Sequence, residues 1–133
     1  MERAFDYGKL KDPRYFRDGR LDAHSDHRYY GSVSDMEAGY EDFKESLNGV
    51  WKFHYARNYK SAVSGFEKMD YCVRDWEDIH VPAHIQMEGY DAPQYANVQY
   101  PWEGHDEIEP GEIPEYFNPV ASYVKYFNVP ERM

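Results

Sequence analysis

The residue types best suited to chemistry gather in one segment, which begins at Ile79 and reads IHVPAHIQMEGYDAPQYANVQYP. It starts as a short apolar stretch that ends at Pro82 and continues as an aromatic-rich loop with one asparagine, the amide Asn97. An amide offers two donors and an acceptor without adding charge, and aromatic faces suit the apolar faces of pyranose rings. These residue types indicate one wall of a sugar site whose other walls lie outside the segment.

Other reactive side chains carry weaker signals. Four acidic residues have the chemistry of acids and bases, but acidic clusters on a loop rich in proline and glycine are typical of solvated surfaces. The four are Glu103, Asp106, Glu107 and Glu109. His80 and His84 have the spacing of a helical zinc site, yet Pro82 lies between them and excludes a shared helical face. Cys72 has no visible relay partner, so a structural role is expected. We therefore predict no catalytic residue and no metal ligand in this chain.

Three residues near the amide admit structural as well as functional interpretations. Asn97 itself is a common turn residue, because asparagine caps its own backbone in loops. Trp102 could stack on a sugar or cover the core, and the packing role is favoured. Asp91 follows Gly-Tyr and precedes a proline, so a turn-forming role is expected for it.

Three segments are predicted to be the strands that position this loop. Trp51, Phe53 and Tyr55 alternate with polar residues after an Asn-Gly turn signal, which is the pattern of a half-buried strand. A short strand over residues 79–81 should stop at the following proline, which cannot donate to a sheet. Residues 121–129 form a third expected strand with apolar residues on both faces, which predicts burial on both faces.

The remaining segments lack clear periodicity. Residues 1–41 are interrupted by glycines and predict an extended arm with short turns. One or two helical turns are expected over Glu37–Ser46. Three prolines between residues 102 and 119 exclude a regular helix or central strand there, so a long surface excursion is expected. So few strands do not close a sandwich, and the chain is expected to be an interrupted domain.

Composition narrows the class of protein. The length of 133 residues corresponds to one domain, and the formal net charge of −10 disfavours nucleic acid and anionic membranes as partners. The single cysteine allows no internal disulfide, which suits a reducing compartment. No segment resembles a signal peptide or reaches the ~20 apolar residues of a membrane span. A soluble, cytoplasmic protein is expected.

Several ordered blocks resemble the N-terminal jelly-roll domain of the large β-galactosidases of glycoside hydrolase family 2. The resemblance covers residues 20–133, and its motifs are specific because they recur in order over most of the chain. The blocks are RLxAH at 20–24, SLNGVWKF at 46–53, Trp76 to Pro82, QMxGYDAPxYxNV at 86–98, Tyr100-Pro101 and NPVxSY at 118–123.

The resemblance implies an all-β, galactose-binding-like jelly-roll sandwich. In this chain it would be incomplete, with an irregular arm at residues 1–45, a partial sugar-binding sandwich at residues 46–133 and further strands outside the chain. The implied activity is retaining hydrolysis of terminal β-D-galactosides such as lactose. The family's catalytic glutamates lie on a separate barrel domain downstream, so this fragment would supply scaffold and be inactive alone. Magnesium and sodium are implied for the full-length enzyme, and none is expected in this chain.

The resemblance also assigns substrate contacts and partners. Asn97 matches the asparagine that the family's N-terminal domain places in the galactose pocket, and Val98 and Trp102 are the neighbouring candidates. The expected partners are a β-galactoside and the remaining domains or subunits of the enzyme. Two alternatives stay open: a free-standing galactoside-binding module, and an assembly element that complements a separately encoded catalytic part.

Overall fold

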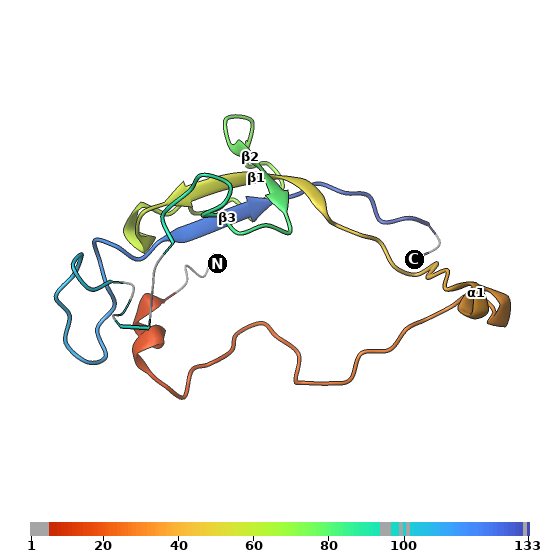
Figure 1. Ribbon diagram of the computed structural model, residues 1–133, viewed down its shortest axis with the longest axis horizontal. Helices are drawn as coiled ribbons and strands as arrows, with labels where there is room; N and C mark the ends of the chain where they lie inside the picture. Colours follow the sequence, from red (N-terminus) through yellow and green to blue (C-terminus); the bar gives the residue numbers. More distant parts are fainter. Residues whose placement is uncertain (1–5, 94–96, 99, 101, 132) are drawn as a thin grey trace.

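The chain forms a small, open antiparallel sheet with little helix (Figure 1). The computed structural model describes residues 6–93, 97–98, 100, 102–131 and 133. In these ranges the sheet has the order β2-β1-β3. Its elements are the strands β1 (Gly49–Ala56), β2 (Glu77–Val81) and β3 (Val120–Val124), the α-helix α1 (Val33–Ala38) and the 3-10 helices η1 (Tyr7–Lys11) and η2 (Tyr59–Ser61).

The central strand β1 confirms the alternation seen in the sequence. Its residue Phe53 is fully buried and lies directly opposite Tyr123 of β3. The Phe53 ring lies 5.0 Å from that of Tyr123 and 4.5 Å from that of Tyr90, which follows β2 in the chain. Trp51 pairs with the buried Ile79 of β2 on the same face, because directly opposed residues in an antiparallel pair share a face. This face holds Phe53 and Ile79, the largest fully buried side chains among the described residues.

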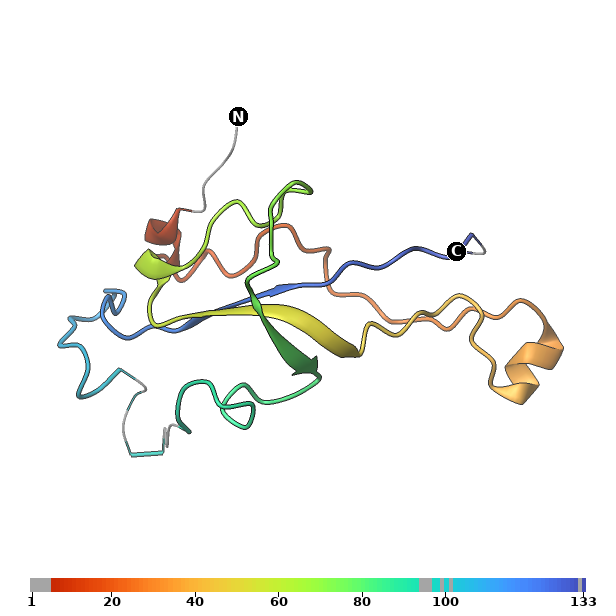
Figure 2. The same cartoon turned by 90° about the horizontal axis from the view of Figure 1, so that it is seen from above.

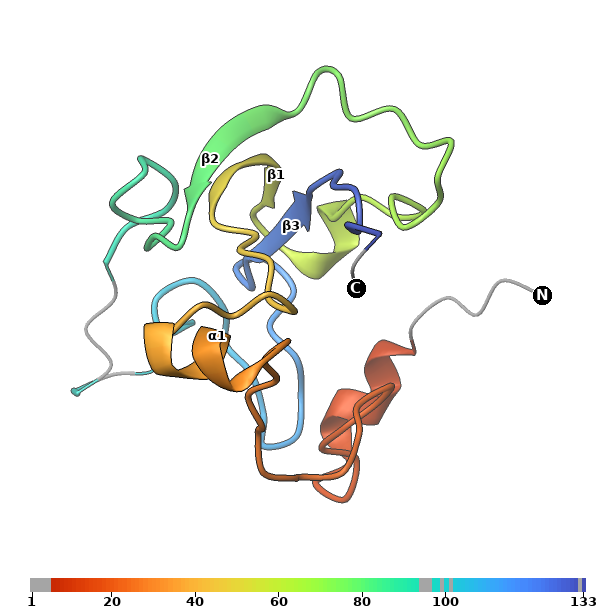
Figure 3. The same ribbon diagram turned by 90° about the vertical axis from the view of Figure 1, so that its right-hand side faces the viewer.

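The opposite face of β1 is covered by the connection between η2 and β2, which arches over the sheet in Figure 3. The Trp76 ring lies 5.5 Å from the His54 ring and also contacts the rings of Phe66 and Tyr71. Lys52 donates to the Trp76 carbonyl oxygen and pairs with its cross-strand neighbour Asp78 at 2.8 Å. An aromatic cluster thus closes this face over only part of the sheet.

The third strand is shorter than predicted. β3 ends at Val124, and the expected continuation to residue 129 is wrong. The prediction that both faces are buried is also wrong beyond Val124, because the exposed fractions of Tyr126, Phe127 and Val129 are 59%, 55% and 67%. In the described residues β3 is an edge strand, paired with β1 only up to Lys52 opposite Val124. Nothing described covers the apolar side chains that follow it.

The helix near the end of the arm begins earlier than predicted. It spans Val33–Ala38 rather than Glu37–Ser46. The Ser32 side chain accepts a hydrogen bond from the backbone N–H of Asp35 at its start. Gly39 ends it in the left-handed region at φ 71°, where glycine has no Cβ penalty. These capping residues determine the position of the helix.

The arm and the long loop lie outside the sheet. The arm runs beneath the sheet from η1 to α1, and the loop over residues 102–119 extends at the same end as η1 (Figures 1 and 2). This loop contains no helix or strand, as its prolines predicted, and β2 ends just before Pro82 as expected. Within the described ranges no helix has the length and apolar character to cross a membrane.

Candidate functional site

The predicted amide lies in the segment that follows β2. Asn97 and Val98 form an exposed turn, and the exposed fraction of Val98 is 80%. Residues 94–96, 99 and 101 lie outside the described residues. Earlier in the segment, Asp91 takes the left-handed backbone conformation at φ 61°, and its carboxylate accepts the N–H of Ala92 at 2.8 Å. The turn-forming role predicted for Asp91 is therefore confirmed.

Two aromatic rings form a flat plate close to this turn in the chain. Tyr100 and Trp102 are stacked with ring centroids 5.2 Å apart and planes only 3° from parallel. Trp102 is half-buried, whereas 64% of Tyr100 is exposed. Both rings line a shallow hollow of about 720 Å³ together with loop residues from Glu103 to Glu112. The Trp102 indole thus packs against Tyr100, which belongs to the same part of the chain.

Asp106 organises the long loop, which the sequence did not predict. Its carboxylate accepts backbone hydrogen bonds from Phe117 at 2.8 Å, Tyr116 at 3.0 Å and Glu115 at 3.2 Å. Partial burial acts to raise the pKa of Asp106, but the N–H donors of Tyr116, Phe117 and Glu115 outweigh it and hold the pKa below the ordinary 3.8. The expectation that all four acidic residues of the loop are merely solvated is therefore wrong for Asp106. Its partners lie nine to eleven residues away, and no local pattern reveals that spacing.

The returning part of the loop is fastened to the end of β1. Asn118 donates its N–H to the Arg57 carbonyl oxygen at 3.1 Å, and Lys60 forms an ion pair with Glu115. The buried ring of Phe117 stacks on the His105 ring at 4.2 Å. These contacts fix the returning part of the loop against the sheet. The hydrogen bonds of Asp106 then tie the outgoing part of the loop to the returning part.

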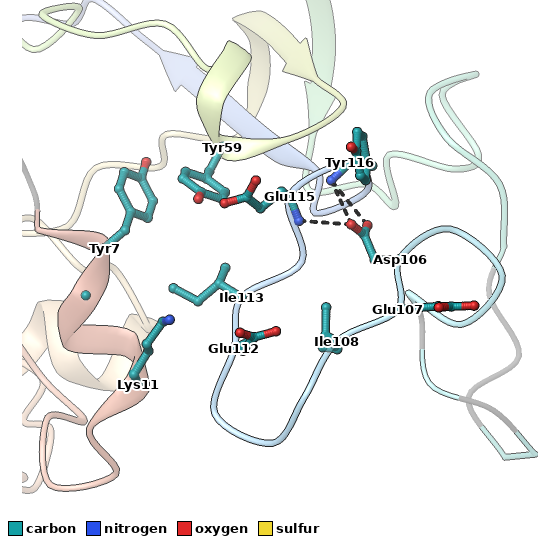
Figure 4. Close-up of a pocket in the computed structure, with 11 residues that line it drawn as sticks. Tyr7, Lys11, Tyr59, Asp106, Glu107, Ile108, Glu112, Ile113, Glu115 and Tyr116 are labelled. Carbon is teal, nitrogen blue, oxygen red and sulfur yellow. Dashed lines mark hydrogen bonds between the residues drawn. The ribbon is translucent and has the colours of Figure 1, made fainter.

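A second, smaller hollow lies between this loop and the 3-10 helix η1 (Figure 4). Its volume is about 370 Å³. Tyr7 of η1 and Tyr59 of η2 face each other at its rim, with ring centroids 4.6 Å apart. Ile113 and Glu112 come from the loop on the other side. No local sequence pattern indicates this hollow, because η1 and the loop are about a hundred residues apart in the chain.

The described residues do not fit the metals implied by the resemblance. No group of three or more His, Cys, Asp and Glu side chains in those residues could hold an ion. His80 instead approaches Glu88, with 3.4 Å between Nδ1 and Oε2, and Cys72 is exposed. We therefore derive no step through magnesium or sodium from this chain. Among the described residues that are not exposed, one buried side-chain atom has no hydrogen-bond partner, Nδ1 of His54.

Comparison with known proteins gives a consistent result. The family described as glycosyl hydrolases family 2, sugar binding domain, matches residues 44–133. A β-galactosidase of Halalkalibacterium halodurans is 48% identical over 125 residues, which cover 93% of this chain and 12% of that protein. A β-galactosidase of Streptococcus thermophilus is 41% identical, over 90% of this chain and 12% of its own length. A β-galactosidase large subunit of Latilactobacillus sakei is 40% identical, over 90% of this chain and 21% of its own. The chain thus spans about an eighth to a fifth of these relatives.

Proposed function

The chain belongs to glycosyl hydrolase family 2 through its sugar binding domain, and on this premise we propose that it is part of a β-galactosidase. In this proposal it supplies scaffold and one wall of the galactose site. The substrates are terminal β-D-galactosides such as lactose. The chain is inactive alone, because the acid pair that cleaves the glycosidic bond belongs to another part of the enzyme.

The observation that carries this proposal is the exposed turn at Asn97, within the family match. A group that reaches a substrate held by another domain must lie on the surface of its own domain. Asn97 and Val98 meet this requirement, whereas Phe53 and Ile79 are the largest fully buried residues of the described chain. The stacked rings of Tyr100 and Trp102 add an aromatic surface two to five residues away.

The mechanism assigns this chain binding and orientation rather than bond cleavage. In retaining hydrolysis one carboxylate attacks the anomeric carbon, while a second donates a proton to the leaving oxygen and later activates water. The Asn97 amide would hold galactose hydroxyls as donor and acceptor, which positions the ring between those carboxylates. Hydrogen bonds to sugar hydroxyls can strengthen in the transition state, so Asn97 would affect turnover as well as binding.

The proposed fold and domain division extend beyond the small sheet. We assign residues 46–133 to a partial jelly-roll sandwich and residues 1–45 to an arm; the family match from residue 44 supports this boundary. Further strands of the sandwich would pair with the outer edge of β3 and cover Tyr126 and Phe127, which are exposed in this chain. Burial of such rings is a strong driving force for association.

The same reasoning gives the partners and the compartment. The remaining β-galactosidase domains are the main partner, either in one polypeptide or as a separate subunit; some relatives are named large subunits, which supports the second arrangement. The single exposed cysteine suits a reducing cytoplasm. Magnesium and sodium would act in the complete enzyme through residues outside this chain.

The test uses reconstitution with the rest of the enzyme. The chain is mixed with a β-galactosidase polypeptide from which the matching segment has been deleted, and hydrolysis of a chromogenic galactoside is measured. Asn97→Ala should lower kcat/KM of the complex by about tenfold or more, the loss expected for one or two hydrogen bonds. Asn48→Ala, at another exposed asparagine, is the matched control and should leave kcat/KM unchanged. Equal activity of the two variants would remove Asn97 from the site.

A further inference from the structure

The hollow between η1 and the long loop combines an aromatic wall with charged and apolar side chains. Its aromatic wall is formed by Tyr7 and Tyr59, whose rings are tilted by 35° to each other at 4.6 Å (Figure 4). Ile108 and Ile113 contribute half-buried apolar surface from the loop. The volume of about 370 Å³ lies in the range of ~300–1,000 Å³ that is usual for small-molecule pockets.

The loop wall is held in place by contacts of residues that line the hollow and of residues next to it. Asp106 ties the outgoing part of the loop to the returning part through three backbone N–H donors, and the Lys60–Glu115 ion pair fastens the latter to η2. Asn58, at the start of η2, also donates to the Tyr116 carbonyl oxygen at 3.5 Å. A wall fixed in this way costs a ligand little ordering entropy.

The charges of the lining select the class of ligand. Four carboxylates and one lysine line the hollow: Asp106, Glu107, Glu112, Glu115 and Lys11. This excess of negative charge repels anionic ligands. A compact cation is also disfavoured, because three of the carboxylates already have partners. Glu115 forms an ion pair with Lys60, and Asp106 accepts backbone donors. Glu112 accepts the N–H of Glu109 at 3.1 Å. A neutral ligand with many hydroxyls could donate to the remaining carboxylate oxygens and accept from the lysine ammonium.

We propose that this hollow is a second saccharide-binding subsite, which takes a neutral hexose unit against the Tyr7–Tyr59 wall. The aromatic rings contact the apolar face of the sugar ring, and the carboxylates and Lys11 bind its hydroxyls. The lining of the subsite includes neither Asn97 nor Val98, and binding there does not depend on catalysis. It would hold an additional sugar unit of a longer substrate, or a second sugar molecule, on the sugar binding domain.

The experiment is saturation-transfer NMR of the 133-residue chain with lactose, followed by a titration for the dissociation constant. Tyr59→Ala should raise that constant by about tenfold or more, whereas Tyr59→Phe, which keeps the ring, should preserve binding. Tyr40→Ala is the matched control, because Tyr40 is 60% exposed and does not line the hollow. Glu112→Arg fills the hollow from an exposed position and should also abolish binding without disturbing the sheet.

The remaining outcomes separate this subsite from the Asn97 site. Asn97→Ala should leave lactose binding to the isolated chain unchanged. Loss of binding with Asn97→Ala but not with Glu112→Arg would overturn the proposal and place any affinity at the turn. Undetectable lactose binding by a chain whose NMR spectrum shows an intact sheet would also overturn it, without affecting the reconstitution test of the proposed function.

Discussion

Phe53→Ala tests the assignment of the core most sharply. Phe53 is fully buried at the centre of β1 and contacts Tyr90 and Tyr123. Truncation of such a ring leaves a cavity between the two tyrosines and typically costs about 3–5 kcal/mol. The described residues bury few other apolar side chains, namely Ala56, Val73, Ile79 and Phe117, so the sheet has little capacity to compensate.

The expected loss is large compared with the total stability. Small domains unfold with about 5–15 kcal/mol, and a chain with so small a core belongs at the lower end of that range. We expect Phe53→Ala to remove most of the cooperative transition in urea, followed by tryptophan fluorescence and near-UV circular dichroism. Phe127→Ala is the matched control, because the same truncation at a 55% exposed position should change the free energy of unfolding by only about 0.5 kcal/mol.

The comparison of the two variants shows whether Phe53 lies at the centre of the core. Equal losses of stability would mean that Phe53 is not the centre of the core. A large loss with Phe127→Ala alone would place the buried surface after β3 instead.

Three further predictions follow from the loop, the core and the sheet edge. Because the pKa of Asp106 is lowered, its contribution to stability should be complete above pH 3.8 and lost as the pH falls through the lower folded-state pKa. Hydrogen exchange of the amides that bind this carboxylate should show the loss. The variant Asp106→Asn should show no such step. The hydrogen bond to Glu77, and then burial, raise the pKa of Tyr90 to about 12. The stabilising effect of Tyr90 should therefore be complete below pH 10 and lost near pH 12. Ultraviolet titration should show this late ionisation, and a late ionisation that persists in Tyr90→Phe would contradict the assignment. The unpaired edge of β3 should make the isolated chain self-associate, and the double variant Tyr126→Lys, Phe127→Lys should reduce this in sedimentation; a monomeric wild-type chain would refute it.

Local patterns predicted the parts of the fold that depend on local physics. Alternation at Trp51, Phe53 and Tyr55 predicted β1 because one face of that strand is buried. The proline after Val81 predicted the end of β2. The helix lies earlier than predicted although its signal is local, because Ser32, Asp35 and Gly39 are capping residues.

Other features depend on contacts that the sequence does not display. The apolar alternation continues beyond Val124, but a strand requires a neighbour, and the described chain provides none there. Asp106 acts on amides nine to eleven residues away, and the Tyr7–Tyr59 contact joins the arm to η2. The roles of Asn97, Val98 and Trp102 in sugar binding remain predictions, since they concern a substrate and other domains.

The most direct test of the central claim compares three samples in the chromogenic galactoside assay. They are the purified chain, the β-galactosidase polypeptide that lacks the matching segment, and the mixture of both. Our account predicts no turnover by the first two and hydrolysis by the mixture, since the chain supplies a wall of the site and the other polypeptide supplies the acid pair. Substantial turnover by the chain alone, or a mixture as inactive as its separate parts, would contradict it.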